Sequence, residues 1–148
     1  MNIELSAQIA APASRVFSVL DDDASVQRWM VGLEETVYLS RPEPPEVVGT
    51  RFRQRVREFG RAVEYLGKVI RYEPPRYLAI RLEHPRATVE VQYELEQTDD
   101  HLSRLVYRTQ MIESDPTAAR LASLMAWYTK KVANTQLQSI KKIAEKSD

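Results

Sequence analysis

The residues best suited to chemistry are polar side chains that alternate with outward-facing residues on predicted strands and lie among apolar neighbours. Tyr93 and Tyr107 hold such positions on consecutive strands, so their hydroxyls could point into one space. Gln54 is the odd polar residue on its apolar face, so it either binds a ligand or satisfies a backbone group. Phenol and amide groups can orient the polar part of an apolar ligand. These residues therefore predict an apolar pocket with a few polar tips.

The full set of candidate pocket residues shares an inward position on a predicted strand or on the last helix. It comprises Phe52, Gln54, Tyr65, Leu82, His84, Val91, Tyr93, Tyr107, Thr109, Met111, Leu121, Met125 and Tyr128. The bulky members could instead pack against one another and fill the core, and the sequence leaves that alternative open.

Histidine titrates near neutral pH, and His84 lies at an inward position of a predicted strand. It stands beside Pro85 at the strand end, which favours a rim or capping role over catalysis. His101 lies in an Asp-rich turn and is expected to be solvated. The histidines lack metal-ligand spacing, cysteine is absent, and no phosphate loop, dinucleotide fingerprint or nucleophile elbow occurs. We therefore expect neither a metal nor a cofactor, and the sequence identifies no catalytic residue.

Period-two alternation predicts the strands that would position these side chains. Ile3, Leu5, Ala7 and Ile9 alternate with polar residues in a first strand, and two short helices follow it as far as Trp29. Further strands are predicted over 37–39, 50–58, 62–72, 77–84, 88–96 and 104–111. Strong alternation in successive strands is typical of an antiparallel sheet with one dry face and one wet face.

One long helix is predicted from Asp115 to about Ala144. Asp115 suits the N-cap, Pro116 suits the first helical position, and apolar residues from Leu121 onward follow helical spacing. Laid across an antiparallel sheet, such a helix would wall off an apolar chamber.

Composition bounds the class of protein. The chain has 148 residues, which we interpret as a single domain over 1–148, and its 43% hydrophobic content is enough for a core. The absence of cysteine and of a signal peptide favours the cytoplasm, and no apolar run could span a bilayer, so we expect no integral membrane contact. Lys plus Arg and Asp plus Glu both number 21, which argues against nucleic acid as a partner. The expected oligomeric state is a monomer or a homodimer.

A ladder of arginines is the strongest sign of a charged binding surface. Arg51, Arg53, Arg55 and Arg57 share the outer face of one predicted strand. Acids of the same sheet, such as Glu90, Glu94 and Glu96, could pair with them, and we favour this account over a binding patch.

Several passages, taken in order, resemble the START-like (SRPBCC) superfamily, in particular its polyketide cyclase/dehydrase and lipid-transport branch. They are 9–12 with Val16-Phe17, then Arg28-Trp29, 49–52 and, most specifically, 67–78. The resemblance implies an α+β helix-grip fold: a curved antiparallel sheet of about seven strands wrapped on a long C-terminal helix, with two short helices after the first strand. It also implies a deep apolar cavity, but not a shared reaction.

Three functions follow as hypotheses. The first is binding of a small hydrophobic molecule, such as a lipid, a polyketide or another aromatic metabolite, between sheet and helix. The second is an enzyme of the cyclase or dehydratase type that uses the same cavity. The third is a protein-interaction module, such as a co-chaperone or a ribosome-associated factor, that uses the outer face.

Overall fold

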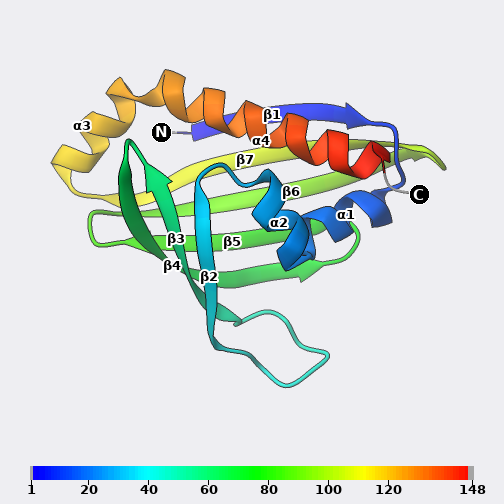
Figure 1. Cartoon of the computed structure of the whole chain (residues 1–148), viewed down its shortest axis with the longest axis horizontal. Coiled ribbons are helices and arrows are strands. Elements are labelled where there is room, and N and C mark those ends of the chain that lie inside the picture. The colour runs from blue at the N-terminus through cyan, green and yellow to red at the C-terminus, as the bar shows by residue number, and fades with distance from the viewer. Residues whose placement is uncertain (1, 147–148) are drawn as a thin grey trace.

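A single curved sheet and four helices make up the structure, a computed structural model that describes residues 2–146 (Figure 1). The strands are β1 (Asn2–Ile9), β2 (Leu33–Ser40), β3 (Arg51–Glu58), β4 (Arg61–Glu73), β5 (Tyr77–His84), β6 (Ala87–Asp99) and β7 (Leu102–Ser114). The helices are α1 (Ala13–Asp21), α2 (Asp23–Trp29), α3 (Pro116–Leu124) and α4 (Ala126–Lys146).

The seven strands form one antiparallel sheet in the order β1-β7-β6-β5-β4-β3-β2. Consecutive strands from β2 to β7 are neighbours, and β1 closes the order by pairing with β7. The predicted strands are confirmed, although β2 begins at Leu33 rather than at Val37 and β6 and β7 extend further at both ends. The helix-grip architecture expected from the sequence is therefore present.

Helix α4 lies across the inner face of the sheet and also packs against α1 and α2 (Figure 1). It buries Ala133, Leu137, Ile140 and Ala144. Its two buried alanines present little side chain, which suits a close approach to the layer beneath. Ile9, Val16 and Leu105 complete the centre of this core.

Asp residues cap two of the helices. The side chain of Asp22 accepts a hydrogen bond from the backbone N–H of Ser25 at the start of α2. Asp115 accepts one from Ala118 at the start of α3, where Pro116 takes the first helical position. The Asp115 cap with Pro116 confirms the sequence prediction for the start of this helix.

The C-terminal helix is not continuous, which corrects the prediction of one helix from Asp115 to Ala144. It breaks at Met125, whose φ of −101° and ψ of 9° leave the helical region, and α4 starts in a new direction (Figure 1). Helix α3 buries none of its residues, whereas α4 packs along the sheet. Apolar periodicity alone could not reveal the break, because the apolar spacing continues across Met125.

Candidate functional site

A cavity of about 600 Å³ lies between the inner face of the sheet, α2 and the first half of α4. Strands β4, β5 and β6 supply apolar wall residues such as Val69, Leu78 and Val91, and α2 supplies Trp29. The three strand residues point to the inner face of the sheet, because a strand places every second side chain on one face. The interior is therefore a chamber rather than a filled core.

Most of the predicted pocket residues meet in this cavity. Those that line it are Phe52, Gln54, Tyr65, Leu82, Val91, Tyr93, Tyr107 and Tyr128. Five others do not contribute to its wall as the structure describes it: His84, Thr109, Met111, Leu121 and Met125.

The helical members of that second group lie outside because the helix is broken. Leu121 is 58% exposed on α3, and Met125 is the residue at which α3 ends. Thr109 is buried within the sheet, where it stands opposite Ile3 on one side and Val91 on the other. Met111 lies further along β7, opposite Val89.

His84 lies at the end of β5, and its Nδ1 accepts a hydrogen bond from the backbone N–H of Arg86 at 3.2 Å. Its ring centroid is 5.8 Å from that of Tyr65. The imidazole thus holds a turn beside the cavity, which is the capping role expected from its position next to Pro85.

Tyr93 and Tyr107 form the polar part of the cavity's deep wall. They are directly opposite each other on β6 and β7, with ring centroids 5.5 Å apart, so the predicted convergence is confirmed. Burial raises the pKa of both phenols, which keeps them protonated at neutral pH. The Tyr93 side chain is buried, yet no hydrogen bond joins its hydroxyl to any group in residues 2–146. An apolar chamber therefore contains a hydrogen-bond donor with no protein partner.

Gln54 is also buried in the wall, and its amide Nε2 lies 3.5 Å from Thr36 Oγ1, at the limit of a hydrogen bond. This contact of the amide is to a side chain rather than to the backbone. The amide is well placed to serve a ligand.

Two tyrosine–aspartate pairs stand at one mouth of the cavity, between the α1–α2 junction and the β2–β3 loop. Tyr38 donates to Asp23 at 2.5 Å, and Tyr72 donates to Asp21 at 2.6 Å. Burial and the carboxylate acceptors raise the pKa of each phenol to about 12. The guanidinium of Arg41 lies 3.7 Å from the centroid of the Tyr38 ring.

The sequence did not predict this mouth, which involves two of the three consecutive aspartates 21–23. Only Asp22 caps a helix, and its neighbours on either side reach tyrosines of β2 and β4. Tyr72 and Asp21 are 51 residues apart, so no local pattern connects them.

The opposite end of the cavity has a different composition. Tyr65 donates to Glu58 at 2.5 Å, and burial together with that carboxylate raises the pKa of the phenol. Tyr128 and Val132 of α4 form the facing wall. Tyr128 also packs against Phe59 at the tip of the β3–β4 hairpin, with ring centroids 4.7 Å apart.

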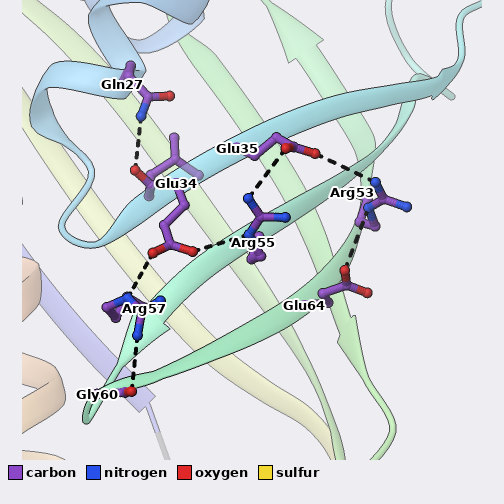
Figure 2. Close-up of polar contacts among 9 residues, drawn as sticks. Gln27, Glu34, Glu35, Arg53, Arg55, Arg57, Gly60 and Glu64 are labelled. Atoms are coloured by element: carbon purple, nitrogen blue, oxygen red, sulfur yellow. Dashed lines mark hydrogen bonds and ion pairs between the residues drawn. The ribbon is translucent and has the colours of Figure 1, made fainter.

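Three of the four ladder arginines on β3 pair with glutamates of the neighbouring strands (Figure 2), and within residues 2–146 Arg51 does not. Arg57 lies 2.8 Å from Glu34, Arg55 lies 3.1 Å from the same carboxylate, and both Arg55 and Arg53 reach Glu35. Arg53 also approaches Glu64 of β4. Cross-strand pairing is thus confirmed.

The acids suggested from the sequence were the wrong ones. Glu90 pairs with Arg81, and Glu94 pairs with Arg108. The order of strands explains the error, because β3 lies between β2 and β4 and is separated from β6 by two strands.

Within residues 2–146, no group of three or more His, Asp or Glu side chains is placed to hold a metal ion. Over the same residues, no helix combines the length and the apolar character that crossing a bilayer demands.

Residues 1–145 match a family model described as polyketide cyclase / dehydrase and lipid transport. A comparison with curated proteins finds no match. The structure resembles that of the Zhui aromatase/cyclase from Streptomyces sp. R1128, with a TM-score of 0.79 and 18% identity over 98% of this chain and 93% of that one.

Two further structures show the same fold. A protein from Thermus thermophilus has a TM-score of 0.77 and 16% identity, covering 99% of this chain and 100% of its own. A START superfamily protein from Mycobacterium smegmatis has a TM-score of 0.68 and 15% identity, covering 97% and 94%. At these identities the likeness concerns the fold alone.

Proposed function

Because the chain belongs to the polyketide cyclase/dehydrase and lipid transport family, we propose that it binds a small hydrophobic molecule in the cavity between its sheet and helix α4. The ligand class is a lipid, a polyketide or another aromatic metabolite. A volume of about 600 Å³ is in the usual range for sites that enclose a small organic ligand.

The observation that carries this proposal is the Tyr93 hydroxyl, which belongs to a residue of the cavity wall and makes no hydrogen bond to another group within residues 2–146. A carbonyl or ether oxygen of a ligand could accept a hydrogen bond from it, and apolar contact would add about 25 cal/mol per Å² of buried surface. The cavity is therefore suited to a ligand with an acceptor at its inner end.

Two matched aromatic ketone and hydrocarbon probes test this binding mode. We expect 2-acetylanthracene and 2-ethylanthracene both to bind and to accept excitation energy from Trp29, which lies 6.1 Å from Tyr93 between ring centroids. Tyr93→Phe should weaken only the ketone, by about fivefold to tenfold, because one hydrogen bond is worth about 1 kcal/mol.

The control is Tyr77→Phe, since Tyr77 is not part of the cavity wall as described and packs under Arg71 instead. It should leave both affinities unchanged. Native mass spectrometry of the purified protein would show whether a natural ligand is retained. Failure of both probes, together with an empty protein, would contradict binding in the cavity.

A cyclase or dehydratase activity is the second candidate. Protonated hydroxyls at Tyr93 and Tyr107 could polarise a carbonyl of a folded poly-carbonyl chain, and an aromatase/cyclase shares the fold. The described wall residues place carboxylates at the two ends of the cavity and none beside these hydroxyls, so a general base is not provided there. Turnover of a poly-β-keto thioester that Tyr93→Phe abolishes while substrate still binds would support the enzyme.

The protein-interaction hypothesis has less support, because three of the four ladder arginines that suggested it are paired with glutamates.

A further inference from the structure

Four large apolar side chains are exposed together at one end of the molecule. Phe59 is at the tip of the β3–β4 hairpin, Leu121 and Leu124 are on α3, and Trp127 is at the start of α4. Each is between 58% and 67% exposed. Figure 1 shows the hairpin tip, α3 and the start of α4 at the same end of the fold. We refer to these four residues as the apolar end.

Ring contacts connect the apolar end to the cavity. Phe59 and Trp127 both pack against Tyr128, at centroid distances of 4.7 and 5.9 Å, and Tyr128 lines the cavity. One side of Tyr128 thus belongs to the chamber and another to the exposed surface.

Helix α3 exposes a larger apolar face than is usual for a helix surrounded by water. Leu121 and Leu124 are one turn apart and therefore neighbours on its surface, yet no residue of α3 is buried. A nine-residue helix gains little stability from its own hydrogen bonds and depends on burying an apolar face. Within the chain as described, nothing covers that face.

Phe59 is an unexpected residue for its backbone position. Its φ is +52°, and Gly60 follows with a φ of +76°, so both central residues of the hairpin turn lie in the left-handed region. Asn and Gly favour such a turn, and a bulky side chain is disfavoured there. The chain keeps a strained aromatic residue where its ring is 65% exposed, which points to a role for the ring outside the folded core.

The surroundings of the apolar end are basic. Residues 116–144 contain five Lys or Arg and no Asp or Glu, although the whole chain has a formal net charge of zero. Arg120 on α3, Lys130 and Lys131 on α4, and Arg61 after the hairpin form no ion pair within residues 2–146. Three acids flank these segments in sequence and offset part of the positive charge: Glu58 accepts from Tyr65, Asp115 caps α3, and Glu113 forms no ion pair among the described residues.

We propose that the apolar end docks on the surface of an anionic lipid bilayer. Phe59 and Trp127 would enter the boundary between headgroups and acyl chains, Leu121 and Leu124 would lie beside them, and the four basic residues would face lipid phosphates. Docking of this kind needs no membrane-spanning segment. It goes beyond the proposed ligand binding, and if that binding holds, Tyr128 places the docked surface next to the chamber.

Charge distinguishes a lipid surface from a second copy of the chain as the occupant. Two copies joined through their apolar ends would bring the same unpaired cations toward one another, which is unfavourable. An anionic bilayer instead offers the opposite charge together with an apolar layer.

Vesicle binding by the ligand-free full chain tests the proposal. A Trp29→Phe background leaves Trp127 as the one tryptophan, because the chain has two. Emission from Trp127 should shift to the blue with vesicles that contain about one-third phosphatidylglycerol in phosphatidylcholine, and the apparent affinity should exceed that for pure phosphatidylcholine by at least about tenfold. No binding to either vesicle would overturn the proposal, and the outcome does not depend on any cavity probe.

Phe59→Asn is the most informative variant. It suits the left-handed turn, so the fold should be at least as stable, while co-sedimentation with anionic vesicles should weaken by about tenfold. A loss of vesicle binding without a loss of stability cannot be attributed to unfolding. Unchanged vesicle binding would remove Phe59 from the docking surface and contradict the proposal.

Leu121→Glu combined with Leu124→Glu should abolish co-sedimentation. Leu66→Glu is its matched control, because Leu66 is 49% exposed on β4, away from the apolar end, and should bind vesicles as the parent does. If sedimentation velocity instead shows a dimer that the α3 variant dissociates, and vesicles do not bind, the apolar end is a self-interface and the proposal is wrong.

Discussion

Two regions of this molecule carry clustered positive charge, and they differ in what surrounds it. Along the arginine ladder of β3, three guanidiniums lie within ion-pair distance of Glu34, Glu35 or Glu64 (Figure 2). At the apolar end, Lys130 and Lys131 have no ion pair among the residues described. A run of basic residues therefore says little about a binding surface until its neighbours in space are known.

The difference arises from secondary structure. In the sheet, register brings β2 and β4 alongside β3, so Glu35 stands opposite Arg55 and so does Glu64. In the helical region, 29 consecutive positions from 116 to 144 contain no acid that could serve as a partner. Three of the four ladder arginines are thus paired within their own sheet, whereas the basic residues beside the apolar end remain unpaired within the described part of the chain.

The largest effect that we expect from the contrast concerns two glycines, one in each region. Gly32 has a φ of +78°, and a Cβ there would lie 2.5 Å from the carbonyl oxygen of Arg57. Gly60, at the tip of the β3–β4 hairpin, has a φ of +76°, and a Cβ added there would have no other atom within 4 Å. Gly32→Ala should lower the free energy of unfolding by about 3 kcal/mol, and Gly60→Ala by about 1 kcal/mol, because only the first adds a backbone clash to the left-handed conformation.

Urea unfolding of the two variants measures this difference directly. Gly60→Ala is the control, since it carries the same dihedral cost without the clash. Equal losses would show that the chain around Gly32 moves away from Arg57 without a cost in stability. That result would contradict tight packing of this segment against the ladder.

A smaller effect separates the two regions by function. Arg53→Glu with Arg55→Glu places acids opposite Glu35 and Glu64, so unfolding should become easier by about 1–2 kcal/mol. Vesicle binding should change by less than about twofold, because Arg53 and Arg55 are already paired with glutamates. Lys130→Glu with Lys131→Glu should do the reverse, with binding weakened at least about tenfold and stability nearly unchanged.

Four proteins are compared: the parent, the two double variants and Lys142→Glu, which is a charge control on the far part of α4. Co-sedimentation and urea unfolding of all four separate the roles of the two regions. If charge reversal at Arg53 and Arg55 weakened vesicle binding as much as charge reversal at Lys130 and Lys131, binding would depend on the protein's net charge rather than on the apolar end.

The sequence predicted the sheet well because the alternation of Val91, Tyr93 and Leu95 is a local property of one strand. It also placed Tyr93 and Tyr107 together, since consecutive antiparallel strands fix which side chains meet. It did not identify the acids opposite the ladder, because alternation within a strand does not say which strands are neighbours, and β3 lies between β2 and β4 rather than beside β6.

The parts of the site that escaped prediction all depend on distant packing. The Tyr72–Asp21 pair joins a strand to the end of a helix, and no spacing in the chain signals it. The break at Met125 has no signal in the apolar spacing, and it leaves Leu121 on the surface rather than in the expected chamber wall. Apolar residues that are exposed on α3 and those that are buried along α4 follow the same helical spacing. The sequence does not distinguish them unless the direction of each helix is known.

The smallest effect that we predict tests whether the ladder's ion pairs hold in solution. Hydrogen bonds from Arg57 and then Arg55 lower the pKa of Glu34 below its ordinary value of 4.5. A carboxyl whose pKa is lower in the folded state stabilises the fold at pH above its ordinary value, and that stabilisation is lost as the pH falls through the lowered value. Glu34→Gln should therefore reduce stability at neutral pH, and the gap from the parent should close as the pH falls below the ordinary value of 4.5 and through the lowered pKa of Glu34.

Urea unfolding of the parent and of Glu34→Gln across this pH range gives the gap, with Glu113→Gln as the control for simple loss of an acidic side chain. Glu113 forms no ion pair within the described residues, so its substitution should give a small gap that does not follow this pH dependence. A gap for Glu34→Gln that stays constant with pH would mean that Arg55 and Arg57 are not held against the carboxylate. The ladder would then be a charged surface as open as the apolar end, and exposure of the apolar residues, rather than pairing of the charges, would be what separates the two regions.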